Sequence, residues 1–549
     1  MRTKNFMLLL LVLFTTGATA QTNVKSASNK ISRPKLVVGI VVDQMRWDYL
    51  YRYYDRYQAD GFKRMLTEGF SCENTFIDYV PTVTAIGHSS VYTGSVPAIH
   101  GIAGNDFIIN ATGKTMYCTE DSTVSTLGSN SKAGRMSPRN LLSSTIGDEL
   151  RLATNFRSKV IGISLKDRGA ILAAGHSATA AYWFDSNGNW ITSTYYMREM
   201  PSWVTDFNNK KLPEKYLKQD WNTLYDIKTY LQSTADDTKY EGLFEGQTAP
   251  VFPIKTSQMF AKDFGILRTT PYGNTLTFDV AKAAIENEKL GQGVVTDMLA
   301  ISLSSPDYVG HKFGVNAIET EDTYLRLDKD IGEFFKYLDA KIGKGNYTVF
   351  LTADHGAAHN IDFSKDNKLN SSKWSGGKVQ REMNLKLEDE FKVKDIVLSM
   401  MNAQVHFNYK VINENNLNEE AIRKICMAYL KTQTDIAFAI DLNNISNAAV
   451  PEEIKKRVIN GHNVHRSGGI QLILNPAVFS AGSSGTSHGA WNPYDAHIPL
   501  VWMGWGIKQG GKLNRPTNMS DIAATVASLL SIQMPNGSIG SPIHETFKN

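Results

Sequence analysis

Continuous apolar runs that end in an acidic or polar residue recur along this chain, and they restrict its fold more than any other feature. The first, KLVVGIVVDQM, is rich in Val and Ile and ends at Asp43 and two further polar or flexible residues. Such an unbroken run is typical of a strand whose two faces are both covered, as in a parallel sheet. Similar runs occur in the segments SKVIGISLKDR, TDMLAISLSSPD, NYTVFLTADHG and HIPLVWMGWG.

Helical patterns separate these strands. The segment SDIAATVASLL has one such pattern, and residues 323–342 have the clearest one. The apolar stripe of the second pattern contains Tyr324, Leu327, Ile331, Phe334, Phe335, Leu338 and Ile342. Strands that alternate with helices predict an α/β fold, here with a large, mostly parallel sheet covered by helices on both faces.

Two regions interrupt this alternation and are predicted to be insertions. Residues of about 180–290 are rich in Trp, Tyr, Asn and Asp, and residues of about 358–478 begin with a polar stretch and have the pattern of an α+β segment. Length alone, at 549 residues, would favour about three or four domains. We instead interpret both regions as insertions on one large domain at 35–549.

The first 20 residues have the organisation of a signal peptide. A short basic start precedes an apolar stretch at residues 6–14 and a small-residue cleavage site at residues 18–20. The stretch is shorter than the roughly 20 apolar residues of a spanning helix, and a buried helix is the alternative. We predict cleavage after residue 20, a flexible linker at 21–34 and a periplasmic or secreted protein. No membrane anchor is expected, because no cysteine follows the cleavage site and no later run is long and apolar enough.

Charge and cysteine content exclude several classes of protein. With 58 basic and 54 acidic residues and no basic run, the chain lacks the charge pattern of a protein that binds nucleic acid. Its three cysteines are too scattered for a zinc ribbon or finger. In an oxidising compartment, Cys72 and Cys118 are the expected disulfide pair, because both flank the same segment. Cys426 lies in a helical pattern and is expected to be a buried free thiol.

Acidic residues and histidines follow several of the predicted strands. In a parallel α/β sheet, side chains beyond the carboxyl ends of the strands converge even when they are far apart in sequence. Each of these residues alone has a structural explanation, as a helix cap, a turn residue or a solvated histidine. Together they supply carboxylate oxygens and imidazole nitrogens, which are ligands of zinc. The candidates are Asp43, Asp307, His311, Asp354, His355 and His488.

The stretch VPTVTAIGHSS, at residues 80–90, contains two threonines, two serines and a histidine. It follows a predicted strand around NTFIDYV, so it is either an active-site turn or a polar connection from a strand to a helix. A threonine hydroxyl is a poor nucleophile at neutral pH, and metal coordination is one way to activate it. The stretch by itself does not distinguish Thr82 from Thr84.

The ordered set of Asp43, the threonine turn, PDYVGH, TADHG and TSHG resembles the bimetallic alkaline phosphatase superfamily, from about Lys35 to the C-terminus. Two stretches, PTVTAIGHSSVYTGSVPAIHGIAGND and SLKDRGA, are similar to the PafA-type bacterial alkaline phosphatases, which are monomeric periplasmic enzymes. The resemblance implies an alkaline phosphatase that acts as a monomer and hydrolyses small-molecule phosphate monoesters. The whole ordered set is specific for this family, whereas any single piece is not.

The resemblance also implies two zinc ions per chain. The ligands of the first ion would be Asp307, His311 and His488, and those of the second would be Asp43, Asp354, His355 and the hydroxyl oxygen of Thr84. Two zinc ions ~4 Å apart can hold the attacking and leaving oxygens of an in-line phosphoryl transfer.

The same resemblance assigns the nucleophile and the groups that bind the substrate. In PafA-type enzymes the threonine before A-x-G-H is the nucleophile, which selects Thr84 over Thr82 and implies a covalent phosphothreonine. Lys166 and Arg168 alternate along a segment that we expect to be extended, so their side chains can point the same way. With Asn105, they correspond to groups that contact the transferred phosphoryl group. The alternative for the Lys-x-Arg pair is a solvated basic loop.

Other functions built on the same metal core are alternatives. Phosphodiesterases of the nucleotide pyrophosphatase group lack the Lys-x-Arg pair, so Lys166 and Arg168 favour monoesters. Sulfatases need a C/S-x-P-x-R motif, which VTAIGH does not contain, and cofactor-independent phosphoglycerate mutases are cytoplasmic and use serine. A non-catalytic zinc-containing binding protein would be expected to have lost a ligand or the nucleophile. The remaining histidines with a polar context are expected to be supporting or structural: His88, His100, His176 and His359.

Overall fold

The structure is a computed structural model that describes residues 31–260 and 263–548. The predicted signal peptide at 1–20 and most of the predicted linker at 21–34 lie outside the described residues. At the end of that linker, the guanidinium of Arg33 donates hydrogen bonds to the carbonyls of Leu530 and Ser531, at 2.6 and 3.1 Å. Within the described ranges, no helix is long and apolar enough to span a membrane.

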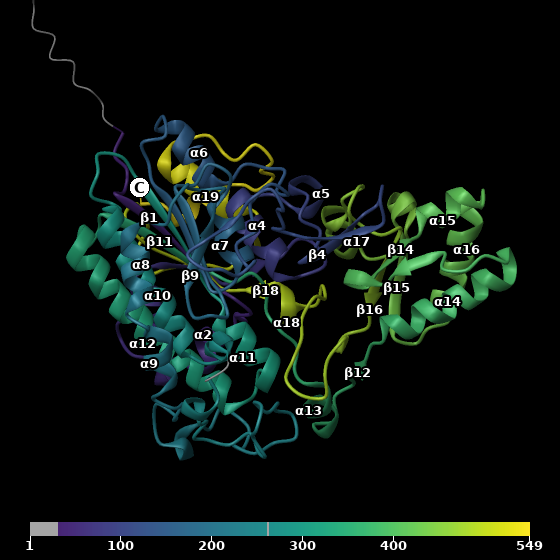
Figure 1. Cartoon of the computed structure of the whole chain (residues 1–549), viewed down its shortest axis with the longest axis horizontal. Helices are drawn as coiled ribbons and strands as arrows, with labels where there is room; N and C mark the ends of the chain where they lie inside the picture. The colour runs from purple at the N-terminus through teal and green to yellow at the C-terminus, as the bar shows by residue number, and fades with distance from the viewer. Residues whose placement is uncertain (1–30, 261–262, 549) are drawn as a thin grey trace, which may run out of the picture. The chain divides into compact units, whose positions relative to one another are not determined.

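A ten-stranded sheet organises the chain (Figure 1). In spatial order its strands are β20 (Gly511–Leu513), β2 (Phe70–Cys72), β19 (Leu500–Gly504), β11 (Tyr347–Thr352), β1 (Leu36–Val42), β10 (Asp297–Leu303), β7 (Val160–Ser164), β8 (Ala180–Phe184), β9 (Trp190–Ser193) and β6 (Thr126–Leu127). The five strands β11, β1, β10, β7 and β8 are mutually parallel. Antiparallel neighbours flank them, β19 on one side and β9 on the other.

This sheet confirms the predicted α/β class, and the five strands predicted from unbroken apolar runs belong to it. The strand predicted around NTFIDYV is β3, which lies in a separate small sheet. Strands β1, β7, β10 and β11 are buried along their whole length, as their unbroken apolar sequences predict. The run HIPLVWMGWG contains β19, which is antiparallel to β11. An apolar run reports burial of both faces and does not report the direction of the strand.

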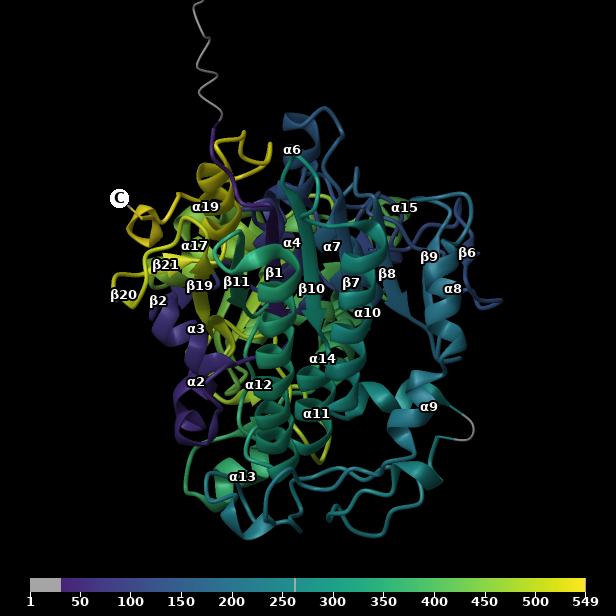
Figure 2. The ribbon, with the colours of Figure 1, turned by 90° about the vertical axis from the view of Figure 1, so that its left-hand side faces the viewer.

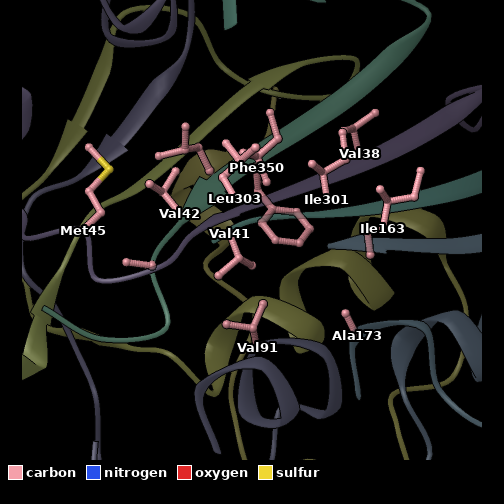
Figure 3. Packing of buried hydrophobic residues seen from close by; sticks show 14 of the residues in the cluster. Val38, Val41, Val42, Met45, Val91, Ile163, Ala173, Ile301, Leu303 and Phe350 are labelled. Atoms are coloured by element: carbon pink, nitrogen blue, oxygen red, sulfur yellow. The ribbon is translucent and has the colours of Figure 1, made fainter. Parts of the chain in front are cut away.

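Helices cover both faces of the sheet. Figures 1 and 2 show α10 (Tyr272–Glu288) and α12 (Ile318–Leu338) on one face, and α4 (Thr84–Thr93) and α7 (Asp167–Ala174) on the other. In Figure 3, Val91 of α4 and Ala173 of α7 lie below the strands that carry Val41 and Ile163. The stripe predicted for 323–342 is buried, in α12 and in the π-helical turn Asp339–Gly343.

Further, mostly shorter helices and strands accompany the main sheet. The further helices are α2 (Tyr49–Arg52), α3 (Phe62–Glu68), α5 (Pro97–His100), α6 (Ile146–Ala153), α11 (Ser305–Phe313), α18 (Pro493–Ala496) and α19 (Asp521–Leu530). A hairpin consists of β4 (Asp106–Ile109) and β5 (Lys114–Tyr117), and a small sheet consists of β18 (His497–Ile498), β3 (Thr75–Phe76) and β21 (Thr517–Asn518).

The second predicted insertion, 358–478, contains a separate four-stranded sheet with its own apolar core. Its strands, in spatial order, are β13 (Val397–Ser399), β14 (Gln404–Phe407), β16 (Ile470–Leu474) and β15 (Ile436–Asp441). Its helices are α13 (Ile361–Asp366), α14 (Gly376–Phe391), α15 (Tyr409–Glu414), α16 (Glu419–Leu430) and α17 (Glu452–Gly461). Strand β12 (Ser372–Lys373), near the start of the insertion, pairs with β17 (Val478–Phe479) at its end.

The first predicted insertion, 180–290, is too wide at both ends. Strands β8 and β9 at its start belong to the main sheet, and α10 at its end covers that sheet. The strands are rich in Trp and Tyr, which is why their sequence was grouped with the aromatic segment that follows. Between β9 and α10 lie α8 (Ser202–Asn209), α9 (Leu212–Leu217) and short 3-10 turns.

The predicted disulfide is absent: Cys72, Cys118 and Cys426 are all buried free thiols. Cys72 lies on β2, whereas Cys118 directly follows β5 of the separate hairpin, so the two flanks of one sequence segment end in different sheets. Burial raises the pKa of Cys72 to about 12 and also raises the pKa of Cys118. The predicted free thiol at Cys426 is confirmed.

Helix α4 begins at Thr84 and contacts the residues after β11 through a glycine. A Cβ at Gly87 would lie 2.5 Å from both the Cβ and the carbonyl oxygen of Asp354. Because Cβ atoms do not approach other atoms so closely, only glycine lets the helix come this near. The contact fixes the distance between the start of α4 and the acidic residues that follow the strand.

We expect Gly87→Ala to destabilise the fold by about 1–3 kcal/mol, because the added methyl group overpacks a contact with rigid backbone. The loss would be measured as a lower midpoint in urea or thermal unfolding. Gly293→Ala is the matched control, since a Cβ at Gly293 meets no atom within 4 Å. Equal midpoints for the two variants would contradict the packing argument.

Candidate active site

Four neighbouring strands deliver polar side chains to one edge of the sheet. Asp43 follows β1, Asp354 and His355 follow β11, and Lys166 follows β7. Helix α11, which follows β10, carries Asp307 in its first turn. The strands are adjacent and parallel in the order β11, β1, β10, β7, so their carboxyl ends bring these segments together.

Asp307, His311 and His488 form the first of two groups that could hold a metal ion. The Nε2 atoms of His311 and His488 lie 3.1 and 3.7 Å from Asp307 Oδ1. Asp307 and His311 share a face of α11, as their spacing of four residues predicts. His488 comes from the loop before α18.

Asp43, Asp354 and His355 form the second group, and all three are fully buried. His355 Nε2 lies 3.5 Å from Asp43 Oδ1 and 3.6 Å from Asp354 Oδ2. Neither carboxylate oxygen accepts a hydrogen bond from the part of the chain that the structure describes. A buried carboxylate oxygen without a donor is costly, so the group is suited to binding a cation.

The two groups are next to each other. The imidazole rings of His355 and His488 stack with their centroids 3.5 Å apart. Lys166 Nζ lies 2.6 Å from Asp43 Oδ2 and 2.5 Å from Asp307 Oδ2, so it contacts one carboxylate of each group. The structure therefore brings together all six Asp and His residues that were predicted to be metal ligands.

Backbone carbonyls orient all three imidazoles of these groups. Each Nδ1 lies 2.8–2.9 Å from a carbonyl oxygen: Thr486 for His311, Gly356 for His355 and Thr82 for His488. A carbonyl oxygen only accepts, so each Nδ1 carries a proton and each Nε2 faces the carboxylates, where the lone pair of a neutral ring is available to a metal ion. Neutral imidazole nitrogens and carboxylate oxygens form a donor set that fits two zinc ions.

Burial controls the ionisation of these groups. Burial, followed by the carboxylates of Asp307 and Asp354, raises the pKa of Asp43 well above its usual range. Burial also opposes ionisation of Asp307, but His311 and Lys166 hold its pKa well below the usual range. Burial lowers the pKa of His488, which favours the neutral form that binds metals. Three carboxylates facing one ammonium leave a negative charge that metal cations would neutralise.

Lys166 and Arg168 lie at the start of α7, so the predicted extended segment is wrong. Lys166 is the N-cap residue and Arg168 is in the first helical turn, because β7 ends only two residues before Lys166. Both side chains nevertheless line one cavity, together with Tyr117 and Tyr308. Arg168 Nη1 donates to Tyr117 Oη at 3.2 Å, whereas the buried Nε of Arg168 has no partner within the described ranges. That N–H is a free donor for an anion.

Thr84 and Asn105 lie beside the second metal group. Thr84 is the first residue of α4, and its Oγ1 lies 3.4 Å from His355 Nε2. Asn105 Oδ1 accepts a hydrogen bond from Ala85 N at 2.9 Å, which leaves the Asn105 amide nitrogen to donate to another group. The hydroxyl of Thr82 instead donates to the carbonyl of Ala490 at 2.7 Å.

The sequence and the fold match known phosphatases. Residues 37–497 match the family described as Type I phosphodiesterase / nucleotide pyrophosphatase. A protein of Myroides odoratus named calcium-transporting ATPase is 57% identical over 528 residues, which cover 95% of this chain and 96% of that protein. The alkaline phosphatase PafA of Elizabethkingia meningoseptica is 52% identical over 527 residues, which cover 95% of this chain and 96% of PafA.

A crystal structure of PafA has a TM-score of 0.93 to this structure, at 51% identity, and the match covers 95% of this chain and 100% of that one. The chain belongs to the PafA-type alkaline phosphatases. The family resemblance predicted from the sequence is thereby confirmed.

In this alkaline phosphatase, Gln44 links the two metal groups. Its backbone N–H donates to Asp354 Oδ1 at 3.1 Å, and its side-chain amide donates to Asp307 Oδ1 at 2.7 Å. A φ of 64° turns the chain sharply after Asp43, which lets both bonds form. Gln44 was not among the site residues predicted from the sequence, although a polar residue directly after a strand-end aspartate is a usable signal.

His88 connects the start of α4 to the phosphatase site, in the supporting role that was expected. Its Nδ1 lies 3.0 Å from the Thr84 carbonyl oxygen and 3.4 Å from Asp354 Oδ2, and its Nε2 lies 2.8 Å from Ser302 Oγ. The other three histidines form hydrogen bonds with residues outside the two metal groups: His100, His176 and His359.

We expect Gln44→Ala to weaken metal binding by roughly 10–100-fold, because it removes the amide that orients Asp307. The affinity would be measured by titrating the metal-free protein with zinc against a competing chelator. Gln219→Ala, at an exposed position, is the control. Unchanged zinc affinity in Gln44→Ala would show that the hydrogen bond to Asp307 does not orient the ligand.

Proposed function

We propose that this phosphatase hydrolyses phosphate monoesters through a covalent phosphothreonine on Thr84, with two zinc ions as cofactors. The observation that carries the proposal is the position of Thr84 Oγ1, 3.4 Å from His355 Nε2 of the second metal group. Thr84 also begins a helix, and the backbone N–H groups at a helix N-terminus favour a phosphoryl anion. The relative and the solved structure that are named alkaline phosphatase support the same reaction.

The proposed reaction has two steps. When bound, the zinc ions would lower the pKa of the Thr84 hydroxyl and stabilise the departing oxygen. Thr84 Oγ1 loses its proton to solvent and attacks phosphorus, and a new O–P bond forms as the ester bond breaks in line with it. The alcohol leaves after taking a proton from solvent. Water then attacks the phosphothreonine, which releases inorganic phosphate and restores the Thr84 hydroxyl.

Lys166, Arg168 and Asn105 are the proposed ligands of the phosphoryl oxygens. Lys166 Nζ contacts a carboxylate of each metal group, and Thr84 lies beside the second group. A phosphoryl group attacked by Thr84 would therefore lie near the Lys166 ammonium. Arg168 has a buried N–H without a partner among the described residues, and Asn105 has an amide nitrogen held in place through Ala85. A monoester has one negative charge more than a diester, and the two cations favour it.

The alternative within the superfamily is a phosphodiesterase, since the family matched at 37–497 is described by that activity. The Lys166–Arg168 pair opposes it. The alternative outside the enzymes is a non-catalytic zinc-containing binding protein. The presence of every metal ligand and of Thr84 argues against it. We also propose zinc over other divalent ions, a monomeric state, and a periplasmic or secreted location that rests on the predicted signal peptide at 1–20.

We expect Thr84→Ala to abolish the phosphoenzyme and to lower turnover of p-nitrophenyl phosphate by on the order of a thousandfold or more, because the attacking oxygen is removed. Acid quenching followed by mass spectrometry would detect the phosphothreonine. Thr82→Ala keeps the carbonyl that orients His488 and should still form the intermediate. Turnover near the wild-type value in Thr84→Ala would refute the mechanism.

Replacement of both Lys166 and Arg168 by Ala should lower kcat/KM for a monoester far more than for a diester, on the order of tenfold more or greater, because charge-assisted contacts to the extra oxygen are lost. Parallel kinetics with p-nitrophenyl phosphate and its methyl diester, with zinc supplied, would measure the two losses. Equal losses would mean that the pair does not distinguish the two classes of ester.

A further inference from the structure

An apolar pocket borders the phosphatase site at the first metal group. His488, a member of that group, is part of the pocket wall, and so is Val83, which directly precedes Thr84. The volume of the pocket is about 220 Å³. Lys166 and Arg168 line a different cavity, so the pocket is separate from the side chains proposed to bind the phosphoryl group.

The wall of the pocket nearest the site consists of the segments 80–83 and 488–491, and two hydrogen bonds join these segments. His488 Nδ1 donates to the Thr82 carbonyl at 2.8 Å, and Thr82 Oγ1 donates to the Ala490 carbonyl at 2.7 Å. The wall is therefore fixed relative to the metal ligand and to Thr84, the next residue after Val83.

The opposite wall comes from the insertion and the residues that directly follow it. Its apolar side chains include Trp374, Met400, Leu472 and Phe479. Trp374 N donates to the Phe479 carbonyl at 3.0 Å, which joins the two ends of the insertion. The insertion is also attached beside the pocket, because the amide of Asn460 donates to the carbonyl of Asp78 at 2.7 Å.

The pocket has no formal charge of its own. Among the described residues that line it there is no Asp, Glu, Lys or Arg. The side-chain amides of Asn402 and Gln471 already donate to backbone carbonyls, at 3.1 Å in each case. The buried Nε1 of Trp491 has no partner in the part of the chain that the structure describes. The pocket therefore offers apolar surface, two indole rings and one unpaired donor.

We propose that this pocket binds the organic group of the leaving alcohol, and that the enzyme prefers monoesters whose alcohol carries an aromatic ring near the ester oxygen. The inference rests on the proposed function. In an in-line displacement the entering and leaving oxygens lie on opposite sides of phosphorus. Because Thr84 lies beside the second metal group, the leaving oxygen lies toward the first, whose ligand His488 borders the pocket.

The size and chemistry of the pocket suit one aromatic ring. An apolar cavity of about 150 Å³ is large enough to hold benzene, so about 220 Å³ accepts a ring with a short link to the ester oxygen. The rings of Trp374, Phe479 and Trp491 can pack against it in the offset or edge-on arrangements that aromatic pairs prefer. A charged alcohol would instead lose water without gaining a partner of opposite charge.

The test compares phenethyl phosphate with ethyl phosphate on the full-length enzyme with zinc supplied. The two alcohols are almost equally acidic, so the comparison reports binding of the ring and not the ease of breaking the ester bond. We expect kcat/KM for phenethyl phosphate to be higher by on the order of tenfold or more, because the ring leaves water. The difference should lie mainly in KM, since the ring is bound both before and during the reaction.

Equal kcat/KM values for the two esters would overturn this inference, while turnover of both would leave the phosphatase reaction intact. Failure to hydrolyse either ester or p-nitrophenyl phosphate would instead refute the proposed function, and this inference with it. The two failures are therefore distinguishable in the same experiment.

Ser480→Trp and Trp491→Ala test the position of the ring. Ser480 is an exposed residue of the pocket wall, so a larger side chain there narrows the pocket, and Trp491→Ala removes part of the wall. Each should lower the ratio of the two kcat/KM values several-fold, mainly by raising KM for phenethyl phosphate.

Ser483→Trp is the matched control, because Ser483 is exposed in the same loop and does not line the pocket. It should keep the wild-type ratio. If Trp491→Ala does not fold, Ser480→Trp and the wild-type comparison still decide. An unchanged ratio in both pocket variants, or an equal fall in Ser483→Trp, would overturn the assignment of the pocket.

Discussion

Three carboxylates buried at one edge of a parallel sheet are the constraint on which the rest of the active site depends. Asp43, Asp307 and Asp354 follow three adjacent strands, so the topology itself places like charges together away from water. Such an arrangement is stable only when cations lie against it. Lys166 supplies one positive charge, and the imidazole nitrogens beside the carboxylates complete two sites of the kind that zinc occupies.

The precision of the site comes from the backbone more than from side chains. Carbonyls orient the three imidazoles, a backbone N–H of Gln44 holds Asp354, and a side-chain-free position at Gly87 lets α4 approach. These backbone groups lie in buried loops and turns, and a main-chain group has fewer rotatable bonds than the end of a long side chain. Ligands fixed by them therefore keep their positions better than ligands fixed by long side chains.

The fold and the ligand residues could be predicted because they depend on patterns of single segments. Unbroken apolar runs identify the central strands, and acidic residues or histidines after several of these runs identify the edge where side chains converge. Such a local pattern does not show which segments pair with each other. For this reason the antiparallel direction of β19 could not be predicted, and Cys72 and Cys118 were wrongly predicted to pair. Strands β8 and β9 were missed because their Trp and Tyr residues resemble the composition of the aromatic segment that follows them. The role of Gln44 depends on contacts between distant segments, which the sequence does not show.

The carbonyl of Thr82 holds His488, while the side chain of Thr84, two residues later, is the proposed nucleophile. The same short turn thus serves the metal centre through its main chain and the chemistry through a side chain. The group that orients His488 is the main-chain carbonyl at position 82, and the proposed nucleophile is the side chain at position 84. A change of that side chain therefore leaves the hydrogen bond to His488 in place. The side chain at position 84 can therefore change, in evolution or by design, while the orientation of His488 is retained.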